Sequence, residues 1–181
     1  MITGGATGNT VGGATAAFEN VISGNTGYAI FADGAATINN SVLNNLVGVK
    51  ADQSGNLANG TGALSIANSA VVIAGGTFNG AVSDGGTLDL NGNGFSIVGA
   101  LTGLGTVTNT ALSGTATLTV DGTATFAGVI QDGATASTAL FKAGTGTFTL
   151  SGANTYSGAT SVQAGSLRAS HTSALESYSV S

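Results

Sequence analysis

Residues 141–169 read FKAGTGTFTLSGANTYSGATSVQAGSLRA, and this stretch decides the fold. In two short runs, Thr147–Leu150 and Ser161–Leu167, apolar side chains alternate with small polar ones. A period of two places one face of a strand inside and the other outside. Each strand is too short to bury its apolar face alone, and no helical stripe lies nearby to cover it. The stretch therefore predicts strands stacked coil upon coil in a β-solenoid.

The same stretch resembles the passenger-associated repeat of Gram-negative autotransporters, whose core is similar to GxGTLxLSGxNTYxGxTxVxAGxL. The matching positions are Gly144, Gly146, Thr147, Leu150, Ser151, Gly152, Asn154, Thr155, Tyr156, Gly158, Thr160, Val162, Ala164, Gly165 and Leu167. The preceding segments LTGLGTVTN and ATLTVDGTATFAGVIQDG are similar to what comes before this repeat in such passengers. The resemblance thus covers about residues 84–175.

The resemblance implies structural roles for the repeat residues. Phe148, Leu150, Val162 and Leu167 are expected in the core, Gly144, Gly152, Gly158 and Gly165 at corners, and Asn154 and Tyr156 at repeat positions, with Tyr156 packing at a corner. It also implies surface display or secretion from a Gram-negative cell, through an outer-membrane β-barrel translocator that lies outside this chain. No basic and apolar leader is seen near Met1, so we expect the export signal to lie outside the chain as well.

Composition supports a folded solenoid. The 181 residues include 31 glycines, no proline and no cysteine; 6% are charged, 42% are hydrophobic, and the mean hydropathy is +0.37. Disordered chains are hydrophilic, and this one is not. The net charge of −5 argues against nucleic acid as a partner, because phosphates require Lys and Arg. The absence of cysteine excludes disulfides and Cys-based metal sites.

We expect a right-handed parallel β-helix, since parallel crossovers are right-handed. About 22 residues per coil would give roughly eight coils in a single segment. Residues 1–16 form a weakly patterned first coil, 17–76 Asn-containing coils, 77–175 Gly-rich coils with the repeat at about 141–169, and 176–181 a cut end.

The Asn-containing region has the pattern apolar-x-Asn. It occurs in Phe18–Ile22, Ile38–Leu43 and Ile66–Val71, with Asn20, Asn40 and Asn68 at the shared position. Asparagine at one place on successive coils predicts a side-chain amide ladder, and it tolerates the left-handed backbone of a sharp corner.

Alternation also predicts which side chains point inward. Along the Gly-rich region these are Leu88, Leu90, Phe95, Ile97, Leu104, Val107, Leu118, Val120, Phe126, Val129 and Ile130. Among the aromatic residues, Phe31, Phe95, Phe126 and Phe148 are expected inside.

No pattern of residues predicts catalysis, a cofactor or a metal. The eight acids are isolated, and four of them precede glycine at turns: Asp33, Asp84, Asp121 and Asp132. Asp33 and Asp52 could stack as a carboxylate pair, which is the weaker alternative. Asp89–Gly94 begins like a calcium loop but has Ala100 where a bidentate Glu is required. His171 is the only histidine.

Three functions remain open from the sequence. The first is a stalk in an autotransporter passenger, with progressive folding during export. The second is an adhesin or self-association module that binds host glycan or protein through a side face. Ice binding is the third and weakest, from the Thr-x-Thr runs Thr115–Thr119, Thr123–Thr125 and Thr145–Thr149. None of the three is an enzyme.

Overall fold

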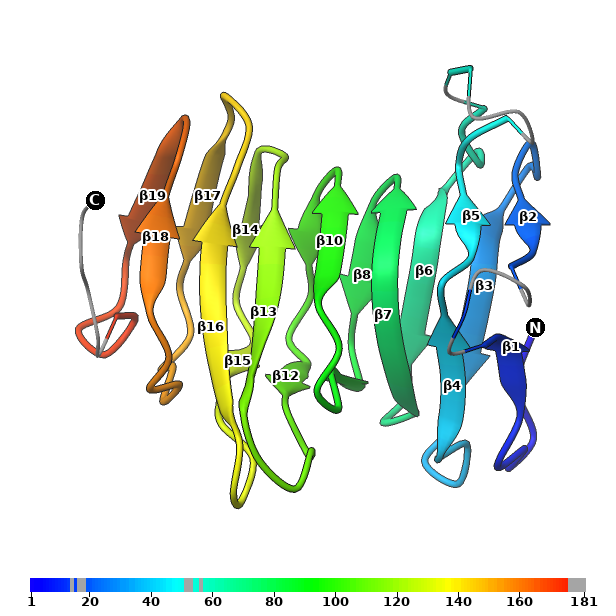
Figure 1. The fold of residues 1–181 in the computed structure, drawn as a ribbon, viewed down its shortest axis with the longest axis horizontal. Helices are drawn as coiled ribbons and strands as arrows, with labels where there is room; N and C mark the ends of the chain where they lie inside the picture. Colours follow the sequence, from blue (N-terminus) through cyan, green and yellow to red (C-terminus); the bar gives the residue numbers. More distant parts are fainter. Residues whose placement is uncertain (14, 16–18, 51–53, 56, 176–181) are drawn as a thin grey trace.

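The computed structural model describes residues 1–13, 15, 19–50, 54–55 and 57–175, and these residues are all-β (Figure 1). Every strand pairing between them is parallel. Over the same residues there is no helix with the length and apolar character to cross a membrane. The predicted parallel solenoid is confirmed at this level.

The strands form three curled sheets, which the chain visits in turn as A, B and C. Sheet A contains Tyr28–Asp33 (β3), Gly62–Ala67 (β6), Val82–Asp84 (β8) and Leu101–Thr102 (β11), and it continues through a Gly103–Phe126 bridge into Ala124–Phe126 (β14), Thr147–Leu150 (β17) and Ser166–Ala169 (β19). Sheet B contains Thr10–Gly12 (β1), Asn40–Leu43 (β4), Thr87–Asp89 (β9), Thr106–Thr108 (β12) and Val129–Ile130 (β15). Sheet C contains Val21–Ile22 (β2), Leu46–Val47 (β5), Phe95–Val98 (β10), Thr115–Val120 (β13), Ser137–Lys142 (β16) and Thr160–Val162 (β18).

One strand joins sheets B and C. Val71–Asn79 (β7) pairs with β4 and β9 through its first half and with β5 and β10 through its second half. The bend falls at Gly75 and Gly76, where Gly76 has a φ of 92°. This corner lies over Asn44, which has a φ of 50° at the same corner of the turn before.

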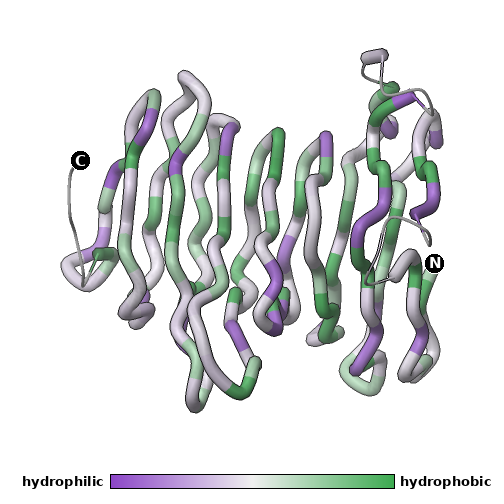
Figure 2. The backbone as a smooth tube through the Cα atoms, viewed as in Figure 1, coloured by the Kyte–Doolittle hydropathy of each residue, from purple (hydrophilic) through white to green (hydrophobic). Residues whose placement is uncertain are grey.

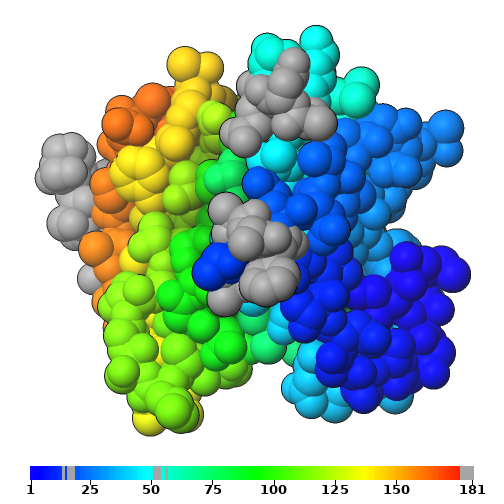
Figure 3. Space-filling model, turned by 45° about the vertical axis from the view of Figure 1, so that its right-hand side comes forward, coloured from blue at the N-terminus to red at the C-terminus, as the bar shows by residue number. Residues whose placement is uncertain are grey.

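Successive turns are unequal in length. Tyr28 pairs with Gly62, 34 positions later, whereas Val71 pairs with Thr87, 16 positions later. Beyond β7 the separations lie between 19 and 24. The N-terminal turns are therefore the long ones, and Figure 3 shows them continuous with the C-terminal turns in one body.

The core is a continuous apolar column inside the three sheets. Hydrophobic residues recur in the turns from one end to the other (Figure 2). On sheet A, Ile66, Phe126 and Leu150 are buried and point inward, and on sheet C the rings of Phe78 and Phe95 meet edge to face with centroids 5.0 Å apart. Most of the predicted inward residues are indeed buried: Leu88, Leu90, Phe95, Ile97, Val107, Leu118, Val120, Phe126, Ile130 and Phe148.

Three inward predictions are wrong. Phe31 is only half-buried, because the register of β3 points Ile30 and Ala32 inward onto Leu64 and Ile66. Leu104 is 81% exposed, since it lies in the corner after β11, and Leu101 is buried in its place. Val129 is likewise only half-buried, beside the buried Ile130.

The asparagines form pairs and not the predicted ladder. Asn20 donates to the Asn45 side chain at 3.0 Å, Asn9 donates to Asn40 at 2.8 Å, and Asn68 donates to Asp33 at 2.6 Å. Asn20, Asn40 and Asn68 therefore do not stack on one another, because the turns here are longer than the sequence spacing of the pattern. Of the three shared positions, only Asn68 has the left-handed corner backbone, with a φ of 48°; near Asn40 it is the preceding Asn39 that has it, with a φ of 57°.

Three Asn–Asn pairs join the first turn to the second, one at each corner: Asn9–Asn40, Asn20–Asn45 and Asn25–Asn59. In the last pair the Asn25 side chain donates to the Asn59 side chain at 2.8 Å. In every pair the more buried member also donates to backbone oxygen: Asn40 to Ala6, Asn45 to Val11 and Asn59 to Ile22. Each pair thus gives a backbone carbonyl of the first turn a side-chain donor from the second.

Candidate functional site

The stretch that decided the fold runs from the end of β16 to β19. Phe148 and Leu150 of β17 are fully buried, as expected for core positions. They pair with Ala124 and Phe126 on one side and with Leu167 and Ala169 on the other. Val162 and Leu167 are only half-buried, and both lie on the last strands of their sheets among the described residues.

Asn154 links three turns where sheet B has no strand. Its side-chain oxygen accepts the Ile130 N–H at 2.8 Å, and its side-chain nitrogen donates to the Ala174 carbonyl at 2.8 Å. Its exposed fraction is zero. Ile130 belongs to the turn before and Ala174 to the turn after, so this amide adds side-chain bonds on both sides to the backbone bonds from Asn154 N–H to Ser173 and from Thr155 N–H to Ile130, each 2.9 Å long.

Tyr156 fills the interior next to this amide. Its ring is fully buried, and its hydroxyl lies 2.6 Å from the Thr160 hydroxyl, which is also buried. Burial raises the pKa of Tyr156, and the Thr160 hydrogen bond offsets part of that effect. The predicted packing role at a corner fits this position.

Glycines form two columns along the edges of the solenoid. The A–B column contains Gly86, Gly105, Gly128 and Gly152, and the C–A column contains Gly80, Gly99, Gly122, Gly146 and Gly165. A Cβ on Gly105, Gly128 or Gly152 would overlap the carbonyl oxygen of the glycine before it or come within 2.6 Å of it. The backbones approach closely because no side chain separates them.

The other two corner glycines of the repeat are constrained in different ways. Gly144 has a φ of 58°, and a Cβ there would overlap the Asp121 carboxylate. Gly158 has ordinary backbone angles, but its Cβ would overlap the Thr138 carbonyl oxygen. Both therefore lie where the sequence placed them, at corners.

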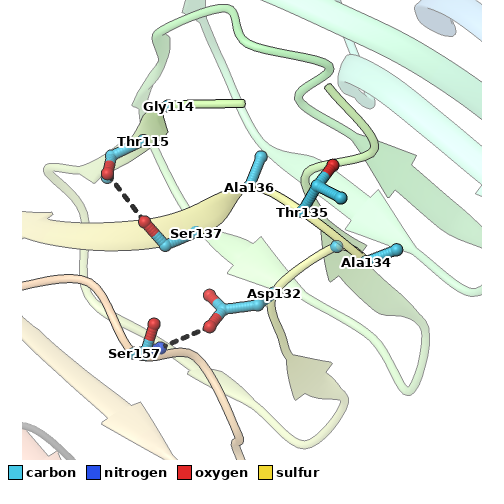
Figure 4. A pocket seen from close by; sticks show the side chains of 9 residues that line it. Gly114, Thr115, Asp132, Ala134, Thr135, Ala136, Ser137 and Ser157 are labelled. Carbon is cyan, nitrogen blue, oxygen red and sulfur yellow. Dashed lines mark hydrogen bonds between the residues drawn. The ribbon is translucent and has the colours of Figure 1, made fainter. Parts of the chain in front are cut away.

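A surface pocket of about 480 Å³ lies beside the repeat (Figure 4). It is lined by Gly114, Thr115, Asp132, Gly133, Ala134, Thr135, Ala136, Ser137 and Ser157. Asp132 accepts the Thr138 N–H at 2.7 Å through one carboxylate oxygen and the Ser157 N–H at 3.0 Å through the other. Opposite it, the Thr115 and Ser137 hydroxyls lie 2.7 Å apart.

Asp132 stays ionised in this pocket. Its partial burial favours the neutral acid, but hydrogen bonds from the Ser157 side chain and from the Thr138 and Ser157 amides outweigh burial and lower the pKa of Asp132. The sequence identified Asp132 only as a turn residue. Its partners come from positions 6 and 25 residues away, and no local sequence pattern signals that convergence.

The repeat geometry agrees with the comparison with known families. Residues 140–169 match the family model described as passenger-associated-transport-repeat. The chain carries an autotransporter passenger repeat. No curated protein and no solved structure matches the chain. Such repeats are passenger segments of secreted or surface-displayed proteins of Gram-negative bacteria.

Replacing Asn154 of the passenger repeat with alanine should destabilise the chain by about 2 to 3 kcal/mol, because a buried N–H and a buried carbonyl lose their partner. Amide exchange at Ile130 measures the effect directly, and we expect faster exchange there. Ala153→Ser, at an exposed neighbouring position, is the matched control. Unchanged protection of Ile130 in Asn154→Ala would contradict the linking role.

A buried lysine closes the corner after β16, near the start of the passenger repeat. Lys142 points inward in sheet C, and its ammonium donates to the carbonyls of Asp121 and Gly144, each at 3.0 Å, and to that of Ala143. Burial lowers the pKa of Lys142, and the Asp121 charge opposes the shift. No local sequence pattern marks this lysine as buried.

Asp84 is the most unusual acid of the chain. It occupies an inward position of sheet A, opposite Ile66, and its exposed fraction is zero. One carboxylate oxygen accepts the Gly86 N–H at 3.1 Å, and the other has no hydrogen-bond partner. Burial raises the pKa of Asp84 to about 8, against a smaller opposing effect of the Gly86 bond. The turn interpretation of Asp84–Gly85 missed this burial.

The remaining candidates do not form a site. Asp52 lies outside the described residues, so the expected pair with Asp33 falls outside them as well. Asp89 accepts the amides of Asn91 and Thr110 as a turn acid, and no three potential metal-ligating side chains cluster anywhere in the described ranges. His171 is exposed and accepts the Ser173 N–H at 3.1 Å.

The threonine runs lie on two sheets. Thr115, Thr117 and Thr119 belong to sheet C, where their partners on β16 are Ser137, Ala139 and Phe141. Thr125 and Thr149 pair in sheet A. The runs therefore build no shared threonine grid, and Thr117 and Thr125 do not lie on one face.

Proposed function

We propose that this chain is a structural stalk segment of an autotransporter passenger, folding progressively as it emerges at the cell surface. The stalk is a right-handed parallel β-helix of about eight coils, with Asn-containing coils over 17–76 and Gly-rich coils over 77–175. A C-terminal outer-membrane barrel outside this chain is its export partner. The passenger repeat at residues 140–169 supports this role.

The observation that carries the proposal is the double link made by Asn154. The same side chain bonds the turn already formed, through Ile130, and the turn that follows, through Ala174. A turn built in this way folds on the one before it and offers a bonding edge to the next. Each addition buries further apolar side chains, which favours outward movement without ATP.

The export role predicts that Leu150→Asp slows display at the cell surface. The substitution would place a charge between Phe126 and Ala169 in the core, so the C-terminal turns would not fold. The chain is joined to an outer-membrane translocator barrel, and its surface arrival is followed by labelling and external protease. Thr149→Asp, which adds the same charge at the neighbouring outward position, is the control. Equal arrival of Leu150→Asp and wild type would contradict folding-driven export.

A second candidate is an adhesin that binds through a side face. It is favoured by the strands β13 and β16, which extend beyond β10 and β18 and carry the pocket at their first residues. The threonine arrangement gives ice binding no support.

A further inference from the structure

Two strands of sheet C project beyond the stacked body. β13 pairs with β16 along Thr115–Val120, but β10 pairs with β13 only from Leu118, and β18 pairs with β16 only from Leu140. Thr115–Thr117 and Ser137–Ala139 therefore extend beyond the neighbouring strands (Figure 1), and on the β16 side the segment before β18 reaches them, where the Gly158 N–H donates to the Thr138 carbonyl at 3.0 Å. Such local extensions of a solenoid are often its binding face.

The pocket at the outer end of this extension has a defined polar chemistry. Asp132 supplies a carboxylate that stays ionised and has lone pairs beyond those used by Thr138 and Ser157. Thr115 and Ser137 bond to each other, which uses one of their two hydroxyl protons and leaves the other free to donate. An ionised acceptor thus faces a free hydroxyl donor across the pocket (Figure 4).

This chemistry selects among ligand classes. No cation lines the pocket, so an anionic ligand would meet only the negative charge of Asp132. A metal ion is disfavoured, because both carboxylate oxygens already accept N–H groups and no second acid lines the pocket. Two adjacent hydroxyls of a sugar match the polar groups of the pocket: one would donate to the Asp132 carboxylate, and the other would accept from the Thr115–Ser137 pair. A volume of about 480 Å³ accommodates one or two sugar rings.

We propose that the pocket formed by Asp132, Thr115, Ser137 and Ser157 binds a neutral saccharide through two adjacent hydroxyls. The pocket is open and contains no aromatic ring, so binding is weak for a single site, with a Kd in the range of about 1 mM. Many copies displayed on one cell would bind a multivalent saccharide more tightly than a single copy does, because each further contact is intramolecular. The proposal goes beyond the stalk role and does not depend on it.

Titration of the ¹⁵N-labelled chain with neutral methyl hexosides tests the proposal. Amide shifts should change at Gly114, Thr115, residues 132–137 and Ser157, and not elsewhere. The double variant Thr115→Val with Ser137→Ala should weaken binding about tenfold, because it removes the free donor. Thr117→Val, on the same strand outside the pocket, should leave binding unchanged.

Three outcomes would overturn the proposal. The first is an absence of shifts with every neutral hexoside at high concentration. The second is equal binding by the double variant and the Thr117→Val control. The third is a pocket response to an anionic sugar or a primary amine that exceeds the response to neutral sugars. Because the readout is binding by the isolated chain, failure here is distinct from failure of export.

Discussion

Replacing Gly128 with alanine is expected to destabilise the chain by about 3 kcal/mol or more. The new Cβ would overlap the Gly105 carbonyl oxygen and lie 2.6 Å from the Phe126 ring. A backbone oxygen cannot rotate away as a side chain does, so adjacent turns must separate and lose their hydrogen bonds. Urea unfolding followed by circular dichroism measures the loss as a lower midpoint.

Gly94→Ala is the matched control for this prediction. Gly94 lies in the same Gly-rich region, but a Cβ there meets nothing within 4 Å and the backbone φ is not positive. Its midpoint should stay close to that of wild type. If Gly128→Ala and Gly94→Ala unfold alike, the columns do not set the spacing of the turns.

The wild-type chain is expected to lose a large part of its stability between acidic and neutral pH because of Asp84, and Asp84→Asn should remove that loss. The pKa of Asp84 rises from its ordinary value of 3.8 to about 8 on folding, because burial disfavours the charged carboxylate. The folded state therefore holds a proton that the unfolded state releases, and the contribution of Asp84 is full below pH 3.8 and declines until about pH 8. Over this pH range the free energy of unfolding falls by an amount on the order of 5 kcal/mol.

The measurement is the difference in unfolding free energy between Asp84→Asn and wild type across that pH range. Asparagine keeps the acceptor for the Gly86 N–H and stays neutral, so the difference should grow in favour of the variant as pH rises. Glu19→Gln, which removes an exposed acid, should show no such growth. A constant difference for Asp84→Asn would mean that the carboxyl is not buried as a neutral acid.

Local sequence rules predicted the strands and most of the core correctly. Period-two alternation places Phe148 and Leu150 inside because a strand fixes its faces by its own backbone. The rule failed at Leu104, since the chain is turning there and alternation does not continue through a corner. Leu101, three positions earlier, still lies on a strand, and its side chain faces the core.

What the sequence did not reveal depends on which turns lie next to one another. The Asn20–Asn45 pair joins residues 25 positions apart, and the Asp132–Ser157 bond spans the same distance. A repeat signal was available in the glycines: the steps from Gly86 to Gly105, Gly128 and Gly152 are 19, 23 and 24, and the steps from Gly80 to Gly99, Gly122 and Gly146 are the same. These matched intervals measure the turns, and they bring Asp132 to within one position of Ser157, which lies 25 positions later.

The parallel stacking of turns has a mechanical consequence. Hydrogen bonds between neighbouring strands run along the long axis of the stack, so tension applied along that axis pulls on them directly and every junction bears the same force. The weakest junction would open first, and the chain would then lengthen in steps of one turn. A rod built in this way resists compression, where its turns press on one another, far better than it resists being pulled from its ends.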